Sequence, residues 1–150
     1  MRIMKNIDIK MREKLAFSST EDKDRFIRVL LEHECTKEVV LLSTCNRVEI
    51  ITRSSSIKAS ARNIIEKLAS YSGVDFDVLY KRADIYDNDG AVHHLFSVAS
   101  ALDSLVIGET QIVGQLKDAF RFSQSKNYCS SNITRVMHYA FKCAANVRNA

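Results

Sequence analysis

The chain has 150 residues, of which 46% are apolar and 27% are charged, and its formal net charge is +4. This length and apolar content indicate one globular domain with its own core, and they exclude a disordered chain or a small disulfide scaffold. The charge is compatible with a nucleic-acid partner but is too small to demonstrate one.

The cysteines and histidines form no pattern typical of a metal site. Cys35, Cys45, Cys129 and Cys143 include no C-x-x-C pair, and the histidines do not fall at zinc-site spacings. No apolar run approaches the roughly 18 residues needed to span a bilayer, and no signal-peptide pattern is present. We therefore expect no metal, no membrane association and a cytoplasmic location with reduced thiols. Because the glycines never form G-x-G-x-x-G, a nicotinamide cofactor would have to be bound outside this chain.

The first half of the chain predicts both strands and helices. Residues 1–9 predict a strand, and Ser18 with Glu21 has the spacing of a capping box before a helix that ends near residue 34. Residues 38–45 and 48–53 predict two strands joined by a tight turn. A second helix begins near Ile57 and ends at Gly73, and residues 78–86 predict a last strand. The order β-α-β-β-α-β indicates an α+β fold with a ferredoxin-like antiparallel sheet.

The second half of the chain predicts helices only. Apolar stripes at helical spacing cover residues 92–102, 112–120 and 133–147, with a break at 103–109. The last stripe stays periodic to the end of the sequence, without a Gly or Pro stop, which suggests that this helix is cut there. We predict one domain over residues 1–150, with an α/β portion at about 1–87, a helical portion at about 88–130 and a last helix from about 131.

The most informative segment is the end of the strand predicted at residues 38–45. There, a run of apolar residues stops at Cys45, which is followed by Asn46 and Arg47. A cysteine at a strand end beside a guanidinium lies in a positive field, which lowers the thiol pKa and favours the nucleophilic thiolate. Taken alone, a cysteine in such a position is more often a small buried apolar side chain.

Two motifs that follow one another in the chain carry a family resemblance. They are Ser43-Thr44-Cys45-Asn46-Arg47-x-Glu49 and His94-Leu95-Phe96-x-Val98-Ala99-Ser100-x-Leu102-Asp103-Ser104-Leu105-Val106-x-Gly108-Glu109-x-Gln111-Ile112-x-Gly114-Gln115-x-Lys117. Together they resemble the N-terminal catalytic domain of the glutamyl-tRNA reductases, and the likeness extends from about residue 11 to residue 148. In that family the domain precedes a long connecting helix, an NADPH-binding domain and a dimerisation domain. The resemblance thus implies that residues 131–150 are the start of the connecting helix.

The resemblance implies an NADPH-dependent reduction of glutamyl-tRNA(Glu) to glutamate-1-semialdehyde, the first step toward 5-aminolevulinate and tetrapyrroles. It aligns Cys45 with the nucleophile that forms a thioester, and His94 with a catalytic histidine. Because the cofactor domain is absent, this chain alone is expected to acylate or hydrolyse but not to reduce. The implied partners are glutamyl-tRNA(Glu), a second copy in the full-length homodimer, and glutamate-1-semialdehyde aminomutase.

The resemblance also implies a substrate pocket around these two residues. Arg47 can present a bidentate fork to the glutamate carboxylate. The other substrate-binding residues that the resemblance implies are Thr44, Asn46, Ser104, Glu109 and Gln111, and Glu49 is implied as a supporting residue.

Plainer roles remain open for several of these residues. His94 can be a structural histidine, Arg47 can simply pair with Glu49, and residues 108–117 can simply connect two helices. The chain also departs from the family by lacking an N-terminal Asn-His-Lys-Thr-Ala-Pro segment and by carrying Ala101 in place of a glycine. Two alternative functions therefore stay open. One is a catalytically silent tRNA- or partner-binding module, and the other is a cysteine acyltransferase or thioesterase.

Overall fold

The computed structural model describes residues 3–9, 17–44, 47–100 and 112–148, which form a four-stranded sheet and six helices. The strands are β1 (Ile3–Ile9), β2 (Thr36–Ser43), β3 (Val48–Ser54) and β4 (Ala83–Asp87). The helices are α1 (Thr20–Leu31), α2 (Ile57–Ser72), α3 (Phe76–Arg82), α4 (Asp89–Ser100), α5 (Ile112–Ser125) and α6 (Ser131–Arg148). None of these helices is long and apolar enough to cross a membrane.

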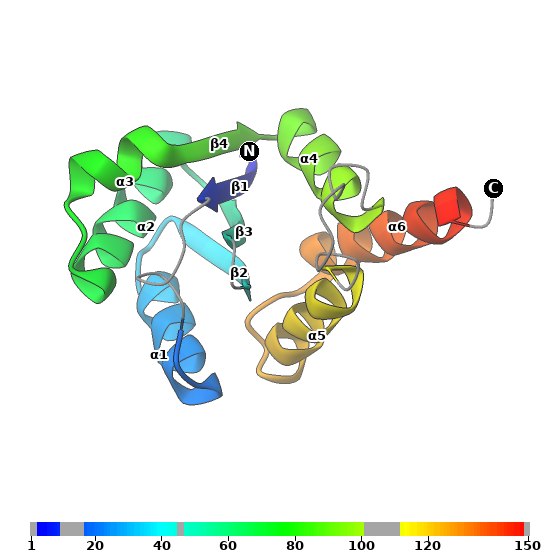
Figure 1. Cartoon of the computed structure of the whole chain (residues 1–150), viewed down its shortest axis with the longest axis horizontal. Coiled ribbons are helices and arrows are strands. Elements are labelled where there is room, and N and C mark those ends of the chain that lie inside the picture. The colour runs from blue at the N-terminus through cyan, green and yellow to red at the C-terminus, as the bar shows by residue number, and fades with distance from the viewer. Residues whose placement is uncertain (1–2, 10–16, 45–46, 101–111, 149–150) are drawn as a thin grey trace.

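The sheet has the strand order β2-β3-β1-β4, and every neighbouring pair is antiparallel (Figure 1). The two central strands, β3 and β1, are not consecutive in the chain, and α1 and β2 lie between them in sequence. This arrangement confirms the predicted α+β fold with a ferredoxin-like antiparallel sheet.

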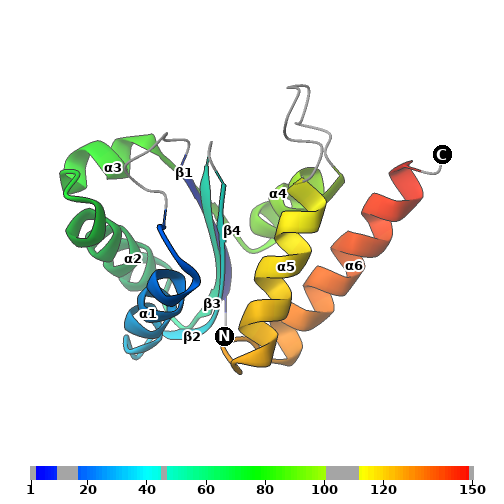
Figure 2. The ribbon, with the colours of Figure 1, turned by 60° about the horizontal axis from the view of Figure 1, so that its bottom comes forward.

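Both faces of the sheet are covered by helices (Figure 2). Helices α1, α2 and α3 lie on one face, and α4, α5 and α6 lie on the other. Because successive side chains of a strand point to opposite faces, Val39 and Leu41 join the first core while Val40 and Leu42 join the second. A strand that is buried on both faces reads as a continuous apolar run, which explains the uninterrupted apolar stretch in β2.

The start of α1 corrects one detail of the sequence-based prediction. Its N-cap is Ser19, whose hydroxyl oxygen accepts a hydrogen bond of 3.1 Å from the backbone N–H of Asp22. The predicted capping box on Ser18 and Glu21 is therefore wrong by one residue, because two adjacent serines offer equivalent cap chemistry and the helix begins after the second. The predicted C-cap of α2 is confirmed, since Gly73 has the left-handed φ of 74°.

The strand predicted at residues 78–86 is wrong in its first half, which forms the short helix α3. Asp75 caps this helix by accepting a hydrogen bond of 3.2 Å from the N–H of Asp77, and Leu79 is fully buried in the first core. Lys81 and Arg82 occupy its last turn, where positive charge stabilises the helix dipole. These cap and charge signals were present in the sequence. Only residues 83–87 form the strand β4.

Candidate functional site

The turn between β2 and β3 is held at both ends by reciprocal hydrogen bonds. The backbone N–H of Thr44 donates to the carbonyl oxygen of Arg47 at 2.9 Å, and the backbone N–H of Arg47 donates to the Thr44 hydroxyl at 3.2 Å. Cys45 and Asn46 lie outside the described residues. The hydrogen bonds hold together Thr44 and Arg47, the residues that precede and follow them in the sequence.

Two carboxylates are buried on the face of the sheet that α4 covers. Ile7 and Ile9 of β1 belong to the core under α1 and α2, so alternation directs Asp8 to the opposite face. The same parity in β3 directs Glu49 to that face, since Val48 and Ile50 join the first core. Asp8 and Glu49 are direct cross-strand partners and are 1% and 0% exposed. Like charges placed directly opposite each other in a sheet repel.

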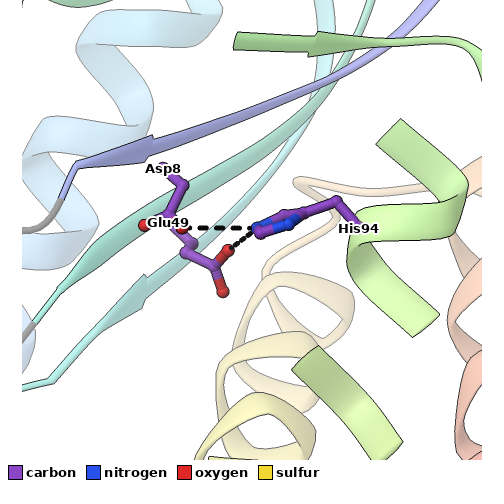
Figure 3. Close-up of side chains that lie close together, drawn as sticks. All are labelled: Asp8, Glu49 and His94. Atoms are coloured by element: carbon purple, nitrogen blue, oxygen red, sulfur yellow. Dashed lines mark hydrogen bonds and ion pairs between the residues drawn. The ribbon is translucent and has the colours of Figure 1, made fainter. Parts of the chain in front are cut away.

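His94 of α4 lies over this carboxylate pair (Figure 3). Its Nε2 is 2.6 Å from Oε1 of Glu49 and 3.4 Å from Oδ2 of Asp8. The imidazole is itself buried, with 9% of its residue surface exposed. The ring thus places a titratable cation beside two acidic groups that have little access to water.

His94 holds its proton more tightly than an ordinary histidine does. Burial lowers the pKa of His94, but the hydrogen bonds and negative charges of Asp8 and Glu49 outweigh this effect and raise it to about 9. Burial also raises the pKa of Glu49, and the charge of Asp8 adds to that shift. At neutral pH the imidazole is therefore an imidazolium whose Nε2–H donates to Glu49, and this charge assistance fits the short distance.

Tyr86 of β4 fixes the plane of the His94 ring. The two rings are stacked, with centroids 4.1 Å apart and an interplanar angle of 9°. A cation over an aromatic face is stabilised electrostatically, so this contact supports the protonated ring and limits its rotation.

Asp8, Glu49 and His94 are also the group in the described part of the chain that could hold a metal ion, because their ligand atoms all lie within 4.8 Å of one another. A histidine must be neutral to coordinate a metal, so a metal ion at this place would have to displace the proton from Nε2 of His94.

Arg47 extends the cluster toward the β2–β3 turn. It is 8% exposed, and its Nη1 lies 4.0 Å from Oε2 of Glu49. This distance is too long for a hydrogen bond, so the contact with Glu49 is an electrostatic one only. The guanidinium of Arg47 therefore adds a positive charge beside Glu49, close to the β2–β3 turn.

The structure brings some of the predicted site residues together and leaves others outside its described part. Thr44, Arg47, Glu49 and His94 lie around one end of the β2–β3 hairpin and the helix above it. The predicted residues that lie outside the described residues are Cys45, Asn46, Ser104, Glu109 and Gln111.

The sequence analysis missed two members of the cluster, Asp8 and Tyr86. The sequence did contain a signal for Asp8, because it is a charged residue between Ile7 and Ile9 in a predicted strand. A strand of this kind has at least one buried face, and it can be buried on both. No local pattern distinguished Tyr86, because its role depends on the pairing of β4 with β1.

Cys129, one of three cysteines in the described part of the chain, is a poor nucleophile. Burial raises the pKa of Cys129 to about 11, and the nearby charge of Glu38 acts in the same direction. This thiol stays protonated at neutral pH, so its surroundings fit a buried structural residue.

Comparison with known proteins identifies the family to which this site belongs. The family model described as the N-terminal domain of glutamyl-tRNA(Glu) reductase matches residues 3–150. The chain belongs to this family.

Curated relatives and a solved structure agree with this membership. The chain is 81% identical over 146 residues to a glutamyl-tRNA reductase of Aliarcobacter butzleri, and 55% identical over 145 residues to that of Campylobacter concisus. Each match covers 97% of this chain and 34% of the relative, so the chain spans about a third of the length of these reductases. The structure of glutamyl-tRNA reductase from Methanopyrus kandleri superposes with a TM-score of 0.70 at 27% identity, over 97% of this chain and 34% of that one.

Proposed function

We propose that this chain is the catalytic domain of an NADPH-dependent glutamyl-tRNA reductase, in which Cys45 accepts the glutamyl group as a thioester. The observation that carries the proposal is the buried imidazolium of His94, held by Glu49 and Asp8 beside the hairpin whose turn contains Cys45. Family membership over residues 3–150 supports the same assignment.

The first chemical step is an acyl transfer. The Cys45 thiolate attacks the carbonyl carbon of the glutamyl ester, the carbon–sulfur bond forms, and the bond from that carbon to the ribose oxygen breaks. The ribose oxygen must take up a proton. His94 is protonated at neutral pH, so it is suited to supply that proton.

Selection of the glutamyl group requires a cation for its side-chain carboxylate. Arg47 is buried and near the turn, and a guanidinium can bind a carboxylate through two parallel hydrogen bonds. Thr44, Asn46, Ser104, Glu109 and Gln111 complete the proposed pocket, with Glu49 as the residue that orients His94.

Reduction depends on parts that the longer relatives possess. NADPH would supply the hydride that converts the thioester to glutamate-1-semialdehyde and releases the Cys45 thiolate. The full-length homodimer and the aminomutase that takes up the aldehyde remain predictions of the same proposal.

The proposal is tested by acid-quench labelling with glutamyl-tRNA that carries a radiolabelled glutamyl group. The chain should retain label on protein, or hydrolyse the ester slowly, without forming aldehyde when NADPH is added. Cys45→Ser should lose the label, whereas Cys143→Ser, a matched control on α6, should keep it.

Equal labelling of Cys45→Ser would remove the proposed nucleophile. Absence of label together with an unreactive Cys45 thiol would favour the silent binding module instead. Acylation by simple glutamyl thioesters as rapid as acylation by the tRNA ester would favour a general cysteine acyltransferase or thioesterase.

A further inference from the structure

A cleft of about 350 Å³ lies along β2, the strand at one edge of the sheet, between α1 and α5. These two helices lie on opposite faces of the sheet (Figure 2), and residues of both helices line the cleft together with residues of β2. Its floor is formed by residues 41–43, the last three residues of β2. None of the residues assigned to the His94 cluster lines it.

The backbone of β2 presents polar groups to this cleft. The N–H of Val39 faces the outer edge, where it donates to the carbonyl oxygen of Tyr128 at 2.9 Å. Because backbone groups alternate between the two sides of a strand, those of Leu41 and Ser43 face the same edge. The segment between α5 and α6 covers the edge at Val39, and the cleft occupies the edge beyond it.

The walls of the cleft combine apolar and polar side chains. Ile27 of α1 and Phe122 of α5 provide apolar surfaces on opposite sides. Lys23 of α1 contributes a positive charge, while Gln115 and Asp118 of α5 are exposed hydrogen-bonding groups. The cleft therefore combines apolar surface with hydrogen-bonding and charged groups, as a site for a polar small molecule requires.

The position of the cleft relative to the nucleophile limits what it can bind. Ser43 lines the cleft, and two residues of extended chain from Ser43 to Cys45 span at most about 7 Å. In an aminoacyl ester of tRNA, only the ribose separates the reacting carbonyl from the base of the last nucleotide. The cleft is therefore within reach of the terminal adenosine of a glutamyl-tRNA whose ester is attacked by Cys45.

We infer that the β2-edge cleft binds the 3′-terminal adenosine of the tRNA substrate. This inference rests on the proposed function. The Hoogsteen edge of adenine offers the N6 donor and the N7 acceptor, which match a backbone carbonyl and N–H of the edge strand β2. Phe122 provides an aromatic surface for the base, Asp118 an acceptor for a ribose hydroxyl, and Lys23 a cation for the preceding phosphate.

The inference is tested first without any chemistry, by adding the trinucleotides CCA and CCU to the Cys45→Ser variant. In NMR spectra, CCA should shift the backbone amide signals of Leu41 and Ser43, and CCU should shift them less. Equal shifts with both trinucleotides, or shifts confined to other parts of the chain, would overturn the inference.

A second arm uses a variant that fills the cleft from its exposed rim. Gln115→Trp should slow acylation of Cys45 by glutamyl-tRNA about tenfold, the scale of one lost base-stacking contact, and leave acylation by a small glutamyl thioester unchanged. Gln124→Trp is the matched control, because residue 124 is exposed on the opposite side of α5. Equal loss with both substrates, or no loss with either, would contradict the inference.

The two arms separate this inference from the proposed function. If CCA shifts the signals of Leu41 and Ser43 but glutamyl-tRNA leaves no label on Cys45, the nucleoside site stands and the thioester chemistry fails. If labelling occurs and CCA has no effect at the cleft, the chemistry stands and the nucleoside site fails.

Discussion

At the scale of single residues, the cluster of Asp8, Glu49 and His94 solves an electrostatic problem that the sheet creates. The two carboxylates are direct cross-strand partners and are almost completely buried. Two such charges repel strongly where water is excluded, unless a cation lies between them. The His94 imidazolium supplies that cation, so the arrangement that stabilises the sheet also keeps a proton near the turn containing Cys45.

Replacing Glu49 with glutamine tests this coupling. The variant keeps the side-chain shape but removes the charge nearest to Nε2, so the pKa of His94 should fall from about 9 toward the ordinary value of 6.5. The titration of the His94 ring signals by NMR measures the change. Glu66→Gln, on the exposed side of α2, should leave the His94 titration unchanged. A His94 pKa that stays near 9 in the Glu49 variant would show that Asp8 alone holds the proton.

At the scale of elements, Glu38 of β2 joins the sheet to the beginning of α6. Its Oε1 accepts hydrogen bonds from the backbone N–H groups of Ser130 at 2.6 Å and Ile133 at 3.3 Å. Its Oε2 lies 2.6 Å from Nε of Arg53, its cross-strand partner on β3. A carboxylate from a distant strand thus binds the unpaired N–H groups at a helix start, where the helix dipole favours negative charge.

Glu38→Ala should lower the free energy of unfolding by about 3–5 kcal/mol, because it leaves a largely buried arginine and the helix N-terminus without their acceptor. Urea unfolding monitored by circular dichroism measures this loss. Glu66→Ala removes an exposed pair with Arg62 and should cost less than about 0.5 kcal/mol. Similar losses in the two variants would contradict the role of Glu38.

Two glycines in helical regions should respond in opposite ways to alanine. Gly73 has a φ of 74° at the end of α2, so Gly73→Ala should destabilise the fold by about 1–2 kcal/mol. Gly90 lies within α4, and an added Cβ there meets no atom within 4 Å. Gly90→Ala should therefore stabilise by about 0.5–1 kcal/mol. The denaturation midpoints of the two variants relative to the parent chain provide the comparison.

At the scale of the whole molecule, one sheet separates two apolar cores, and the titratable cluster lies on the side that α4, α5 and α6 cover (Figure 2). The helical portion therefore takes part in the titratable cluster, because α4 supplies His94. Unfolding of either side exposes the carboxylate pair to water, so the protonation of His94 is linked to global stability.

The stability of the chain should fall between pH 6.5 and pH 9. The pKa of His94 is higher in the folded chain than in the unfolded chain, so the folded state binds the proton more tightly. This contribution is fully present below pH 6.5 and is lost as the pH rises through about 9. Urea midpoints at pH 6, 7.5 and 8.5 test the slope below pH 9.0, the ordinary pKa at which the Cys129 thiol of the unfolded chain loses its proton. The His94→Gln variant should lose this slope, and a slope that persists in it would assign the effect to another group.

The elements whose patterns are local could be predicted from the sequence. Alternation and helical spacing located β1, β2, β3 and the long helices, and Gly73 was recognisable as the end of α2. The prediction was wrong for residues 78–82, where a buried Leu79 and a capping Asp75 favour a helix over a strand. The family resemblance rested on ordered motifs in the chain, and the match over residues 3–150 confirms it.

Contacts between residues that are distant in the sequence follow from the three-dimensional fold and could not be predicted from local patterns. His94 bonds to a carboxylate 45 positions earlier, and the partner of that carboxylate lies on a third element, β1. Local pattern assigns a side chain to one face of its strand or helix, but it carries no information on strand order or register. The buried proton site and the edge cleft both depend on that order, because β1 lies beside β3 and β2 lies at the edge of the sheet.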